Sequence, residues 1–236
     1  MFDVSYMIQN TPKILEALPR TLLIAVISMS IGLVLGLLLA LIRLNRVKLL
    51  ERLATLYISF FRGTPVLVQM YLIFYSLPYV FMYLNEKWQT TFFPEHFSPL
   101  LTAIIIFSLN ITAYVSEAWY AGLDSVEYGQ VEAGQSVGMT WLQTIRHIIL
   151  PQALVNALPN FGNAFIGLIK GTSLAFSIQV VDLMAVAKIQ AGDDYRYLEM
   201  YAAVSLIYWG VCFLLERLFI YLEKRFSKFK TKTIYV

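Results

Sequence analysis

Charged residues are scarce in this chain and cysteine is almost absent. Asp, Glu, Lys and Arg make up 14% of the 236 residues, where a soluble domain carries roughly 25%. A single cysteine, Cys212, excludes a disulfide framework within the chain. Aromatic residues make up 15%, which excludes disorder, and a net charge of +3 is too small to indicate a nucleic-acid partner. With 58% hydrophobic residues, the composition indicates a folded membrane protein.

The residues of an enzyme site are also missing. His96 and His147 are 51 positions apart, and no metal-ligand spacing links either of them to Cys212. Gly32 and Gly36 lie inside an apolar run, where small residues favour close helix packing rather than phosphate binding. We therefore expect no catalytic residues, no metal site and no cofactor bound by this chain.

Long uncharged runs predict the spans. The 22 uncharged residues between Arg20 and Arg43 would form a helix of roughly 33 Å, enough for a hydrocarbon core of about 30 Å. The same criterion gives an all-α integral membrane protein with five transmembrane helices in a single domain over residues 1–236. Pro78 is expected to end or kink the second helix. The predicted spans are 20–42, 56–77, 98–120, 155–180 and 198–220.

The basic residues predict the orientation. With the N-terminus outside, the inner segments hold 11 Lys and Arg residues and the outer segments hold 5. This asymmetry favours an outside N-terminus and an inside C-terminus, because short cytoplasmic loops carry the excess of positive charge. Residues 121–154 then form a long cytoplasmic loop.

The cytoplasmic loop has an organised pattern. A helix over about 127–136 is expected, ended by Gly138. A second helical piece follows from about 140, and Pro151 redirects the chain toward the fourth span. Such a compact element suits docking on another protein; the alternative is that it packs only against its own spans. The apolar face of the second piece consists of Trp141, Leu142, Ile145, Ile148 and Ile149.

The same loop resembles the EAA loop of ATP-binding-cassette (ABC) importer permeases. The resemblance rests on Glu132-Ala133-Gly134, Gly138, Ile148 and Leu150-Pro151, with Gly134 where a second alanine is usual. Polar amino-acid permeases in particular are similar in several further segments, which cover nearly the whole chain. Those segments are Arg62-Gly63-Thr64-Pro65 with Gln69, Gly129-Gln130 before Glu132, Leu158-Pro159-Asn160 with Asn163, and Lys170-Gly171-Thr172-Ser173-Leu174.

Two departures from the family pattern bear on the substrate. Gly171 stands where many members have Asp, and Ala121-Gly122 stands where an Arg-Gly pair is common. They leave the fold inference intact but weaken any assignment of one substrate. The segment from Lys170 to Phe176 is similar to that of cystine permeases, which suggests L-cystine.

The resemblance implies a type I importer permease in a bacterial inner membrane. Its partners would be a cytoplasmic ABC ATPase dimer that uses ATP and Mg²⁺, a second permease copy or close relative, and an extracytoplasmic solute-binding protein that delivers a polar amino acid. The implied ATPase-coupling residues are Gly129, Gln130, Glu132, Ala133, Gly134, Gly138, Ile148, Leu150 and Pro151. The implied residues of a substrate path or gate are Arg62, Gly63, Thr64, Pro65, Gln69, Asn110, Glu117, Lys170, Thr172 and Ser173.

Several of these residues allow two interpretations. Lys170 is costly in lipid, so it is expected to face the interior, either on the substrate path or in an ion pair with Glu117. Arg62 to Pro65 could shape an inner gate or only start a span. Polar span residues such as Asn110, Thr112, Thr172 and Ser173 could line the path or bond between helices. The outer acids Asp182, Asp193, Asp194 and Glu199 are expected to be solvated, with contact to an external partner as the alternative.

Two other function classes remain open at this point. A non-transport membrane protein, such as an assembly factor or a membrane enzyme, would need a reactive cluster, which the sequence does not show. A secondary transporter would not need a docking loop and usually has inverted repeats. Copurification of an ATPase subunit would separate an ABC permease from both.

Overall fold

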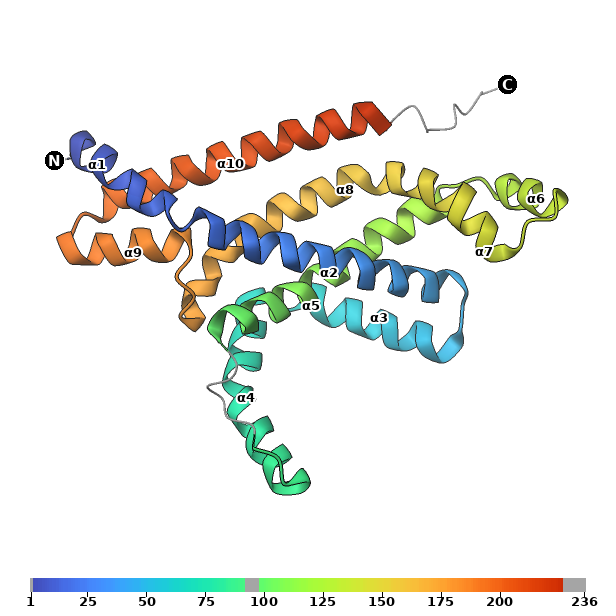
Figure 1. Cartoon of the computed structure of the whole chain (residues 1–236), viewed down its shortest axis with the longest axis horizontal. Helices are drawn as coiled ribbons and strands as arrows, with labels where there is room; N and C mark the ends of the chain where they lie inside the picture. Colours follow the sequence, from blue (N-terminus) through green and yellow to red (C-terminus); the bar gives the residue numbers. More distant parts are fainter. Residues whose placement is uncertain (1, 92–97, 227–236) are drawn as a thin grey trace.

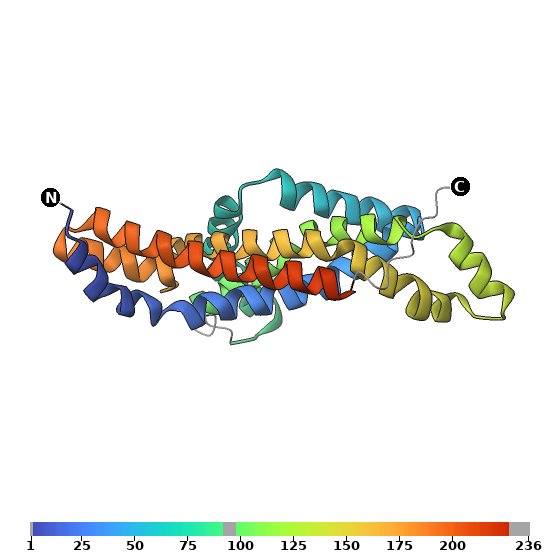
Figure 2. The ribbon, with the colours of Figure 1, turned by 90° about the horizontal axis from the view of Figure 1, so that it is seen from above.

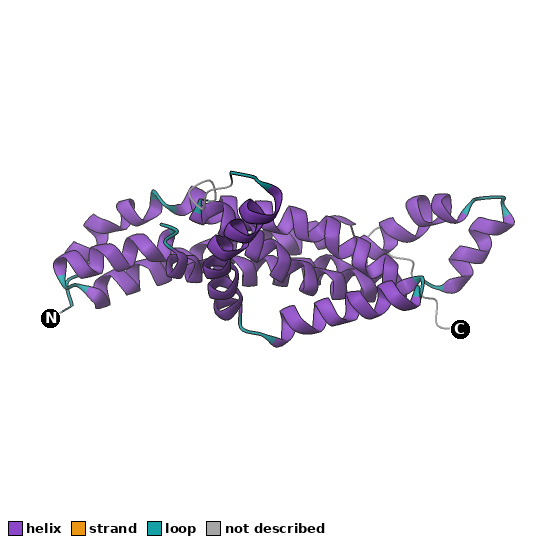
Figure 3. Ribbon diagram, turned by 90° about the horizontal axis from the view of Figure 1, so that it is seen from below, coloured by secondary structure: helices purple, strands orange, loops and turns teal. Residues whose placement is uncertain are grey.

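A computed structural model of the chain describes residues 2–91 and 98–226. Every regular element within these ranges is helical (Figure 3). The helices are α1 (Val4–Leu15), α2 (Leu18–Leu44), α3 (Lys48–Gly63), α4 (Val66–Trp88), α5 (Pro99–Asp124), α6 (Tyr128–Ser136), α7 (Trp141–Thr144), the π-helical turn Ile145–Ile149, α8 (Leu150–Gly171), the 3₁₀ segment Thr172–Ile178, α9 (Leu183–Asp194) and α10 (Tyr197–Phe226).

The molecule is an elongated bundle around α5. Helices α2, α5, α8 and α10 run along its length, with α1 and α9 at one end and α6 and α7 at the other (Figure 1). Helix α5 packs most extensively against α2 and next against α8. Phe107 and Val115 of α5 are almost wholly buried, so this helix forms the centre of the core.

Within residues 2–91 and 98–226, five helical segments are long and apolar enough to span a membrane, as the sequence predicts. Their predicted limits need two corrections, at the second and the fourth segment. The five segments are Leu18–Leu44, Val66–Trp88, Pro99–Asp124, Trp141–Ile178 and Tyr197–Phe226.

The predicted helix over 56–77 is wrong, because the chain breaks at Thr64 and Pro65 between α3 and α4. Thr64 is extended (φ −118°, ψ 144°), as a residue before proline tends to be. After the break α4 runs across the long axis of the bundle (Figures 1 and 2). Pro78 lies inside α4 and does not end it.

The chain changes direction between α7 and α8, close to where Pro151 was expected to redirect it, but the change occurs within a continuous helical run (Figures 1 and 2). The π-helical turn Ile145–Ile149 leads directly into α8, and the backbone N–H of Leu150 donates to the carbonyl of Ile145. Pro151 then lies in the first turn of α8, directly after the π-helical turn. The fourth segment is therefore helical from the loop into the bundle and begins well before the predicted residue 155.

Glycines bring α2 and α5 together, as the small-residue spacing predicts. A Cβ added to Gly36 would lie 3.0 Å from both the Ser116 backbone nitrogen and Val115 Cγ1. A Cβ on Gly32 would lie 2.6 Å from Ile111 Cγ2. Side chains at these two positions would separate the most extensively packed helix pair of the bundle.

We expect Gly36→Val to destabilise the protein, whereas Gly210→Val should not. The added carbons of Gly36→Val meet α5 backbone, while a Cβ at Gly210 has open space around it. Overpacking of about 1–3 kcal/mol corresponds to an apparent Tm lower by about 2–10 °C. Thermal unfolding of both variants in the same detergent checks this, and an equal Tm for the two would contradict the packing argument.

Candidate functional site

A cavity of about 970 Å³ lies between the α3–α4 break, α5 and α8. Six of the ten predicted path or gate residues line it, from Arg62 through Pro65 together with Asn110 and Glu117. The full lining is Arg62, Gly63, Thr64, Pro65, Val66, Phe107, Asn110, Ile111, Tyr114, Glu117, Ala118, Ala121, Asn160, Asn163, Ala164, Gly167, Leu168 and Gly171.

Glu117 of α5 is held by arginines from two other helices. One carboxylate oxygen forms an ion pair with Arg43 at the end of α2. The other oxygen lies 3.7 Å from Arg62 Nη1 of α3. The predicted pairing of Glu117 with Lys170 is therefore wrong, because Glu117 projects toward α2 and α3.

The two arginines differ in their surroundings. The Arg43 side chain is 20% exposed, and its guanidinium stacks 4.5 Å from the centre of the Tyr120 ring. The Arg62 side chain is 47% exposed and lies 5.7 Å from the Tyr114 ring centre. Arg43 is thus a packed structural partner of Glu117, whereas Arg62 presents its guanidinium to the cavity.

The buried amide of Gln69 closes the helix break behind the cavity. Its Nε2 donates to the carbonyls of Phe61 and Thr64, each at 3.0 Å. Its Oε1 accepts from Asn110 Nδ2 at 2.9 Å. Gln69 is therefore a structural residue, and Asn110 lines the cavity with its amide already bonded.

The other predicted path residues lie away from the cavity lining. Thr172 is fully buried and donates to the carbonyl of Ile169, while Ser173 donates to the carbonyl of Lys170. Thr112 likewise bonds the carbonyl of Ser108. Each hydroxyl is hydrogen-bonded to a backbone carbonyl three or four residues earlier. These contacts support a structural role rather than a place on the substrate path.

Lys170 does not face the interior of this chain. Its side chain is exposed, and no ion pair joins it to a residue in the described ranges. The predicted burial is wrong for the chain on its own, because this position of α8 lies outside the faces that pack on α5 and α10.

Sequence reasoning missed the role of Arg43 behind the cavity wall and of three residues that line the cavity. Arg43 was counted only among the basic residues that predict the membrane orientation, and Tyr114 was not considered. Asn160 and Asn163 entered only through the family resemblance, although their spacing of three on one helix places them on a common face. Polar residues on one face of an apolar span are the signal that could have identified the amides.

The loop between α5 and α8 forms two short helices that project beyond the bundle (Figure 3). Helix α6 closely matches the predicted 127–136. Gly138 follows it with φ +82°, in the left-handed region that favours glycine. Thr140 and Gln143 then form a capping box that starts α7.

Packing within this loop explains its small residue at position 134. A Cβ on Gly134 would lie 2.9 Å from Thr144 Oγ1 and 3.1 Å from Ile148 Cδ1. Glycine in place of the family's usual alanine therefore lets α6 approach the helix that follows it. Ile149 is buried, and Ile145 and Ile148 are partly buried.

The outer surface of the loop is unexpectedly apolar. Tyr128, Val137 and Leu142 are 73%, 77% and 72% exposed, and Trp141 is 43% exposed. The predicted single apolar face is therefore divided, since Trp141 and Leu142 do not pack inward with the isoleucines. Glu132 is exposed on the same element.

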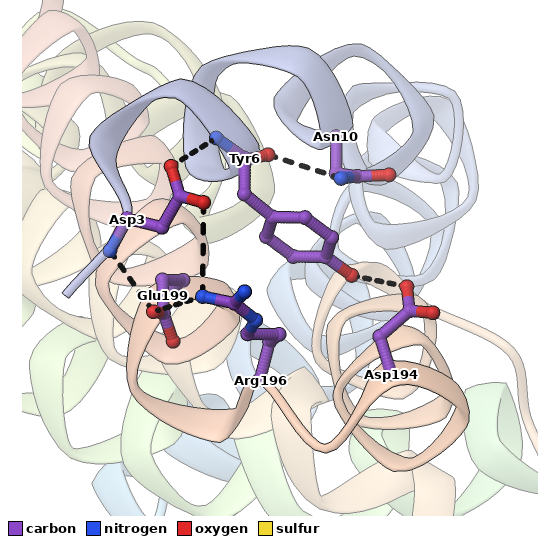
Figure 4. Close-up of polar contacts among 6 residues, drawn as sticks. All are labelled: Asp3, Tyr6, Asn10, Asp194, Arg196 and Glu199. Atoms are coloured by element: carbon purple, nitrogen blue, oxygen red, sulfur yellow. Dashed lines mark hydrogen bonds and ion pairs between the residues drawn. The ribbon is translucent and has the colours of Figure 1, made fainter. Parts of the chain in front are cut away.

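A polar network ties the N-terminal helix to the α9–α10 turn at the opposite end (Figure 4). Arg196 lies 3.7 Å from Asp3 and 3.3 Å from Glu199, and Glu199 also accepts from the Asp3 backbone N–H. Tyr6 donates its hydroxyl to Asp194, and this bond raises the pKa of Tyr6 to about 12. The hydroxyl therefore remains a donor at neutral pH.

The expectation that the outer acids are all solvated is wrong. Glu199 is buried within the network, and Asp182 is fully buried, where it caps α9 by accepting from the Ala185 backbone N–H. Burial raises the pKa of the Asp182 carboxyl above its usual range. Asp193 is exposed as predicted, and Asp194 is exposed but bonded to Tyr6.

Comparison with known proteins agrees with the family resemblance that the sequence motifs indicate. Residues 32–228 match the family "Binding-protein-dependent transport system inner membrane component". The chain is 43% identical to "Probable amino-acid permease protein YxeN" of Bacillus subtilis (strain 168), over 96% of each protein. It is 38% identical to "L-cystine transport system permease protein TcyL" of the same organism, over 100% of this chain and 96% of that protein.

Solved structures show the same fold. The structure described as "Crystal structure of an amino acid ABC transporter with histidines" matches with a TM-score of 0.79 and 31% identity, over 95% of this chain and 99% of the other. A structure of the MetNI methionine ABC transporter matches at TM-score 0.70 and 18% identity, over 90% and 95% of the two chains, and supports the fold alone. Proteins of this family are transport permeases and not enzymes, since ATP hydrolysis belongs to a separate subunit. The chain belongs to the binding-protein-dependent inner-membrane transport components, and it is the permease component of an amino-acid ABC importer.

Proposed function

We propose that this permease imports a polar amino acid, with L-cystine as the first candidate, after an extracytoplasmic solute-binding protein delivers it. The motif from Lys170 to Phe176 and the similarity to a permease named for L-cystine support this substrate. The cavity of about 970 Å³, with the charged and amide side chains on its wall, has room for an amino acid of that size. Uptake of radiolabelled L-cystine by proteoliposomes that contain the complete transporter tests the assignment.

The loop of α6 and α7 is proposed to couple this transport to ATP hydrolysis. The observation that carries the proposal is a projecting element with three apolar side chains more than 70% exposed. Exposed aromatic and aliphatic side chains on a compact element typically become buried in a protein partner. We propose that the partner is a cytoplasmic ABC ATPase dimer, which binds ATP and Mg²⁺, while this chain binds no cofactor.

The exposed residues fit separate roles in this docking. Glu132 would meet a cationic or hydrogen-bonding group on the ATPase, and Ala133 would let the two surfaces approach. Gly129 and Gln130 lie in the first turn of α6, while Gly134 and Ile148 hold the two helices of the loop together. Leu150 and Pro151 join the loop to α8, so movement of the loop would reach the cavity wall.

The complete transporter is proposed to hold two permeases, this chain with a second copy or a close relative, in a bacterial inner membrane. The open side of the cavity and exposed Lys170 would face water or the second permease, because an unpaired lysine is costly in lipid. We further propose that the N-terminus lies outside and the C-terminus inside. The 11-to-5 distribution of Lys and Arg supports this orientation.

We expect Gly138→Val to uncouple the transporter, because a β-branched residue is strained at φ +82°. Gly138→Asn is the matched control, since asparagine tolerates the left-handed region better than other residues with side chains. Uptake and substrate-stimulated ATPase activity in proteoliposomes should fall at least about tenfold for the valine variant, as a strain of 1–3 kcal/mol allows. The asparagine variant should keep most of its activity.

Glu132→Ala should weaken binding of the ATPase subunit to the permease. The amount of ATPase subunit that copurifies with the permease measures this. Binding of substrate to the isolated solute-binding protein should not change for either loop variant. Wild-type uptake together with full retention of the ATPase in both Gly138→Val and Glu132→Ala would contradict a coupling role for the loop.

The orientation is tested by cysteine labelling in a Cys212→Ala background, which leaves the chain without another cysteine. Asn10→Cys on α1 should react with a membrane-impermeant maleimide in intact cells. Ser136→Cys on α6 is exposed and should react only after the membrane is permeabilised. The reverse pattern would contradict both the orientation and the docking of the loop on a cytoplasmic subunit.

A further inference from the structure

We infer that the cavity selects amino acids that are zwitterionic or carry net negative charge, that it disfavours cationic amino acids, and that Arg62 binds the substrate carboxylate. This inference rests on the proposed transport of an amino acid through the cavity. It concerns the charge of the substrate and is independent of whether the substrate is L-cystine.

The cavity lies beside a cluster of three charged side chains, Arg43, Arg62 and Glu117, whose sum is positive. Arg62 and Glu117 are the two lining residues in the described ranges that carry charge at neutral pH. Glu117 is already paired with Arg43, which stacks on Tyr120 behind the wall. Two guanidinium groups and one carboxylate leave a net charge of +1 at the site. Lys170 on α8 is exposed and basic, so it does not offset this positive charge.

Arg62 has the unused hydrogen-bonding capacity. Its closest approach to Glu117 is 3.7 Å, which is too long for a hydrogen bond, and its guanidinium makes none to the described residues. Tyr114 lies against the guanidinium at 5.7 Å and limits its orientations. A guanidinium with free, coplanar N–H groups matches the two oxygens of a carboxylate. Arg62 can therefore bind a carboxylate without breaking an existing bond.

The opposite wall offers neutral acceptors. Asn160 and Asn163 line the cavity from α8, are exposed, and form no hydrogen bond within the described part of the chain. Their amide oxygens can accept from the α-ammonium group that every free amino acid carries. They supply no negative charge, so a cationic group that the substrate's own carboxylates do not balance, such as the guanidinium of L-arginine, would lose hydration without gaining an ion pair.

The test is equilibrium binding of radiolabelled L-cystine, L-glutamine, L-glutamate and L-arginine to the permease–ATPase complex in nanodiscs, without the solute-binding protein. The tightest of the first three should bind at least about tenfold more tightly than L-arginine, since an uncompensated charge costs more than 1.4 kcal/mol. Arg62→Gln should weaken that tightest ligand by about tenfold or more, and Arg62→Lys by less. Asn163→Asp should raise the affinity for L-arginine, because it adds a free carboxylate to the wall.

Each arm can overturn the inference by itself. L-arginine binding as tightly as the best of the other three, or an unchanged affinity in Arg62→Gln, would do so. If Arg62→Gln does not assemble, Asn163→Asp still decides, because an unchanged preference against L-arginine contradicts the role of the missing carboxylate. If none of the four binds at millimolar concentration, the cavity is not the selective site.

Uptake by the complete transporter separates this inference from the proposed function. ATP-dependent uptake in which L-arginine is the best substrate would leave the import function standing and overturn the charge selection. A complete transporter that moves no amino acid would overturn the proposed function, and the charge selection would fall with it.

Discussion

Close contact of α5 with α2 on one side and with α8 on the other is the constraint on which the rest of the structure depends. Gly36 brings the backbones of α2 and α5 together, and Gly122 lets α5 approach the carbonyl of Ala153, which a Cβ at Gly122 would meet at 2.6 Å. Lipid chains are as apolar as the helices, so such packing replaces the hydrophobic drive of a soluble core. Glu117 reaches both Arg43 and Arg62 only because three helices are held at these separations.

The break between α3 and α4 is a local exception to helical regularity. Backbone groups without a partner are costly inside a membrane protein, and irregular backbone is tolerated only where protein or water satisfies it. The Gln69 amide satisfies two carbonyls at the break and is itself fixed by Asn110. Arg62 lies one residue before the end of α3, so its guanidinium is held next to this hydrogen-bonded break.

The sequence predicted the parts of the fold that depend on local rules. The length of apolar runs gave the number of candidate spans, and Gly138 with the small residues before it gave helix α6 and its end. These features follow from the hydrophobic period and from backbone conformation, both of which can be read along the chain. The positive-φ glycine is the clearest case, since few other residues fit that geometry.

The features that sequence reasoning missed depend on partners far away in the chain. Glu117 was assigned to Lys170, yet its partners come from positions 74 and 55 residues earlier, and helix rotation decided the outcome. Glu199 and Asp182 were expected at the surface because acidic residues usually are, but Arg196 and the end of α9 supply their partners. Proline at 65 breaks the chain while proline at 78 and proline at 151 do not, because the structure around each one decides.

The helical run from Trp141 through the π-helical turn into α8 has a mechanical consequence. This helical run, roughly 45 Å along its path at 1.5 Å per residue, bends between α7 and α8 (Figures 1 and 2). It carries the projecting loop at one end and Asn160, Asn163 and Gly167 of the cavity wall farther along. A push on the loop would therefore reach the cavity wall through a helical backbone and not through an irregular linker. The wider π turn at Ile145–Ile149, Pro151 and Pro159 interrupt the α-helical hydrogen bonding of this run. Small changes of hydrogen-bond register at these points would adjust how far a movement of the loop displaces the cavity wall.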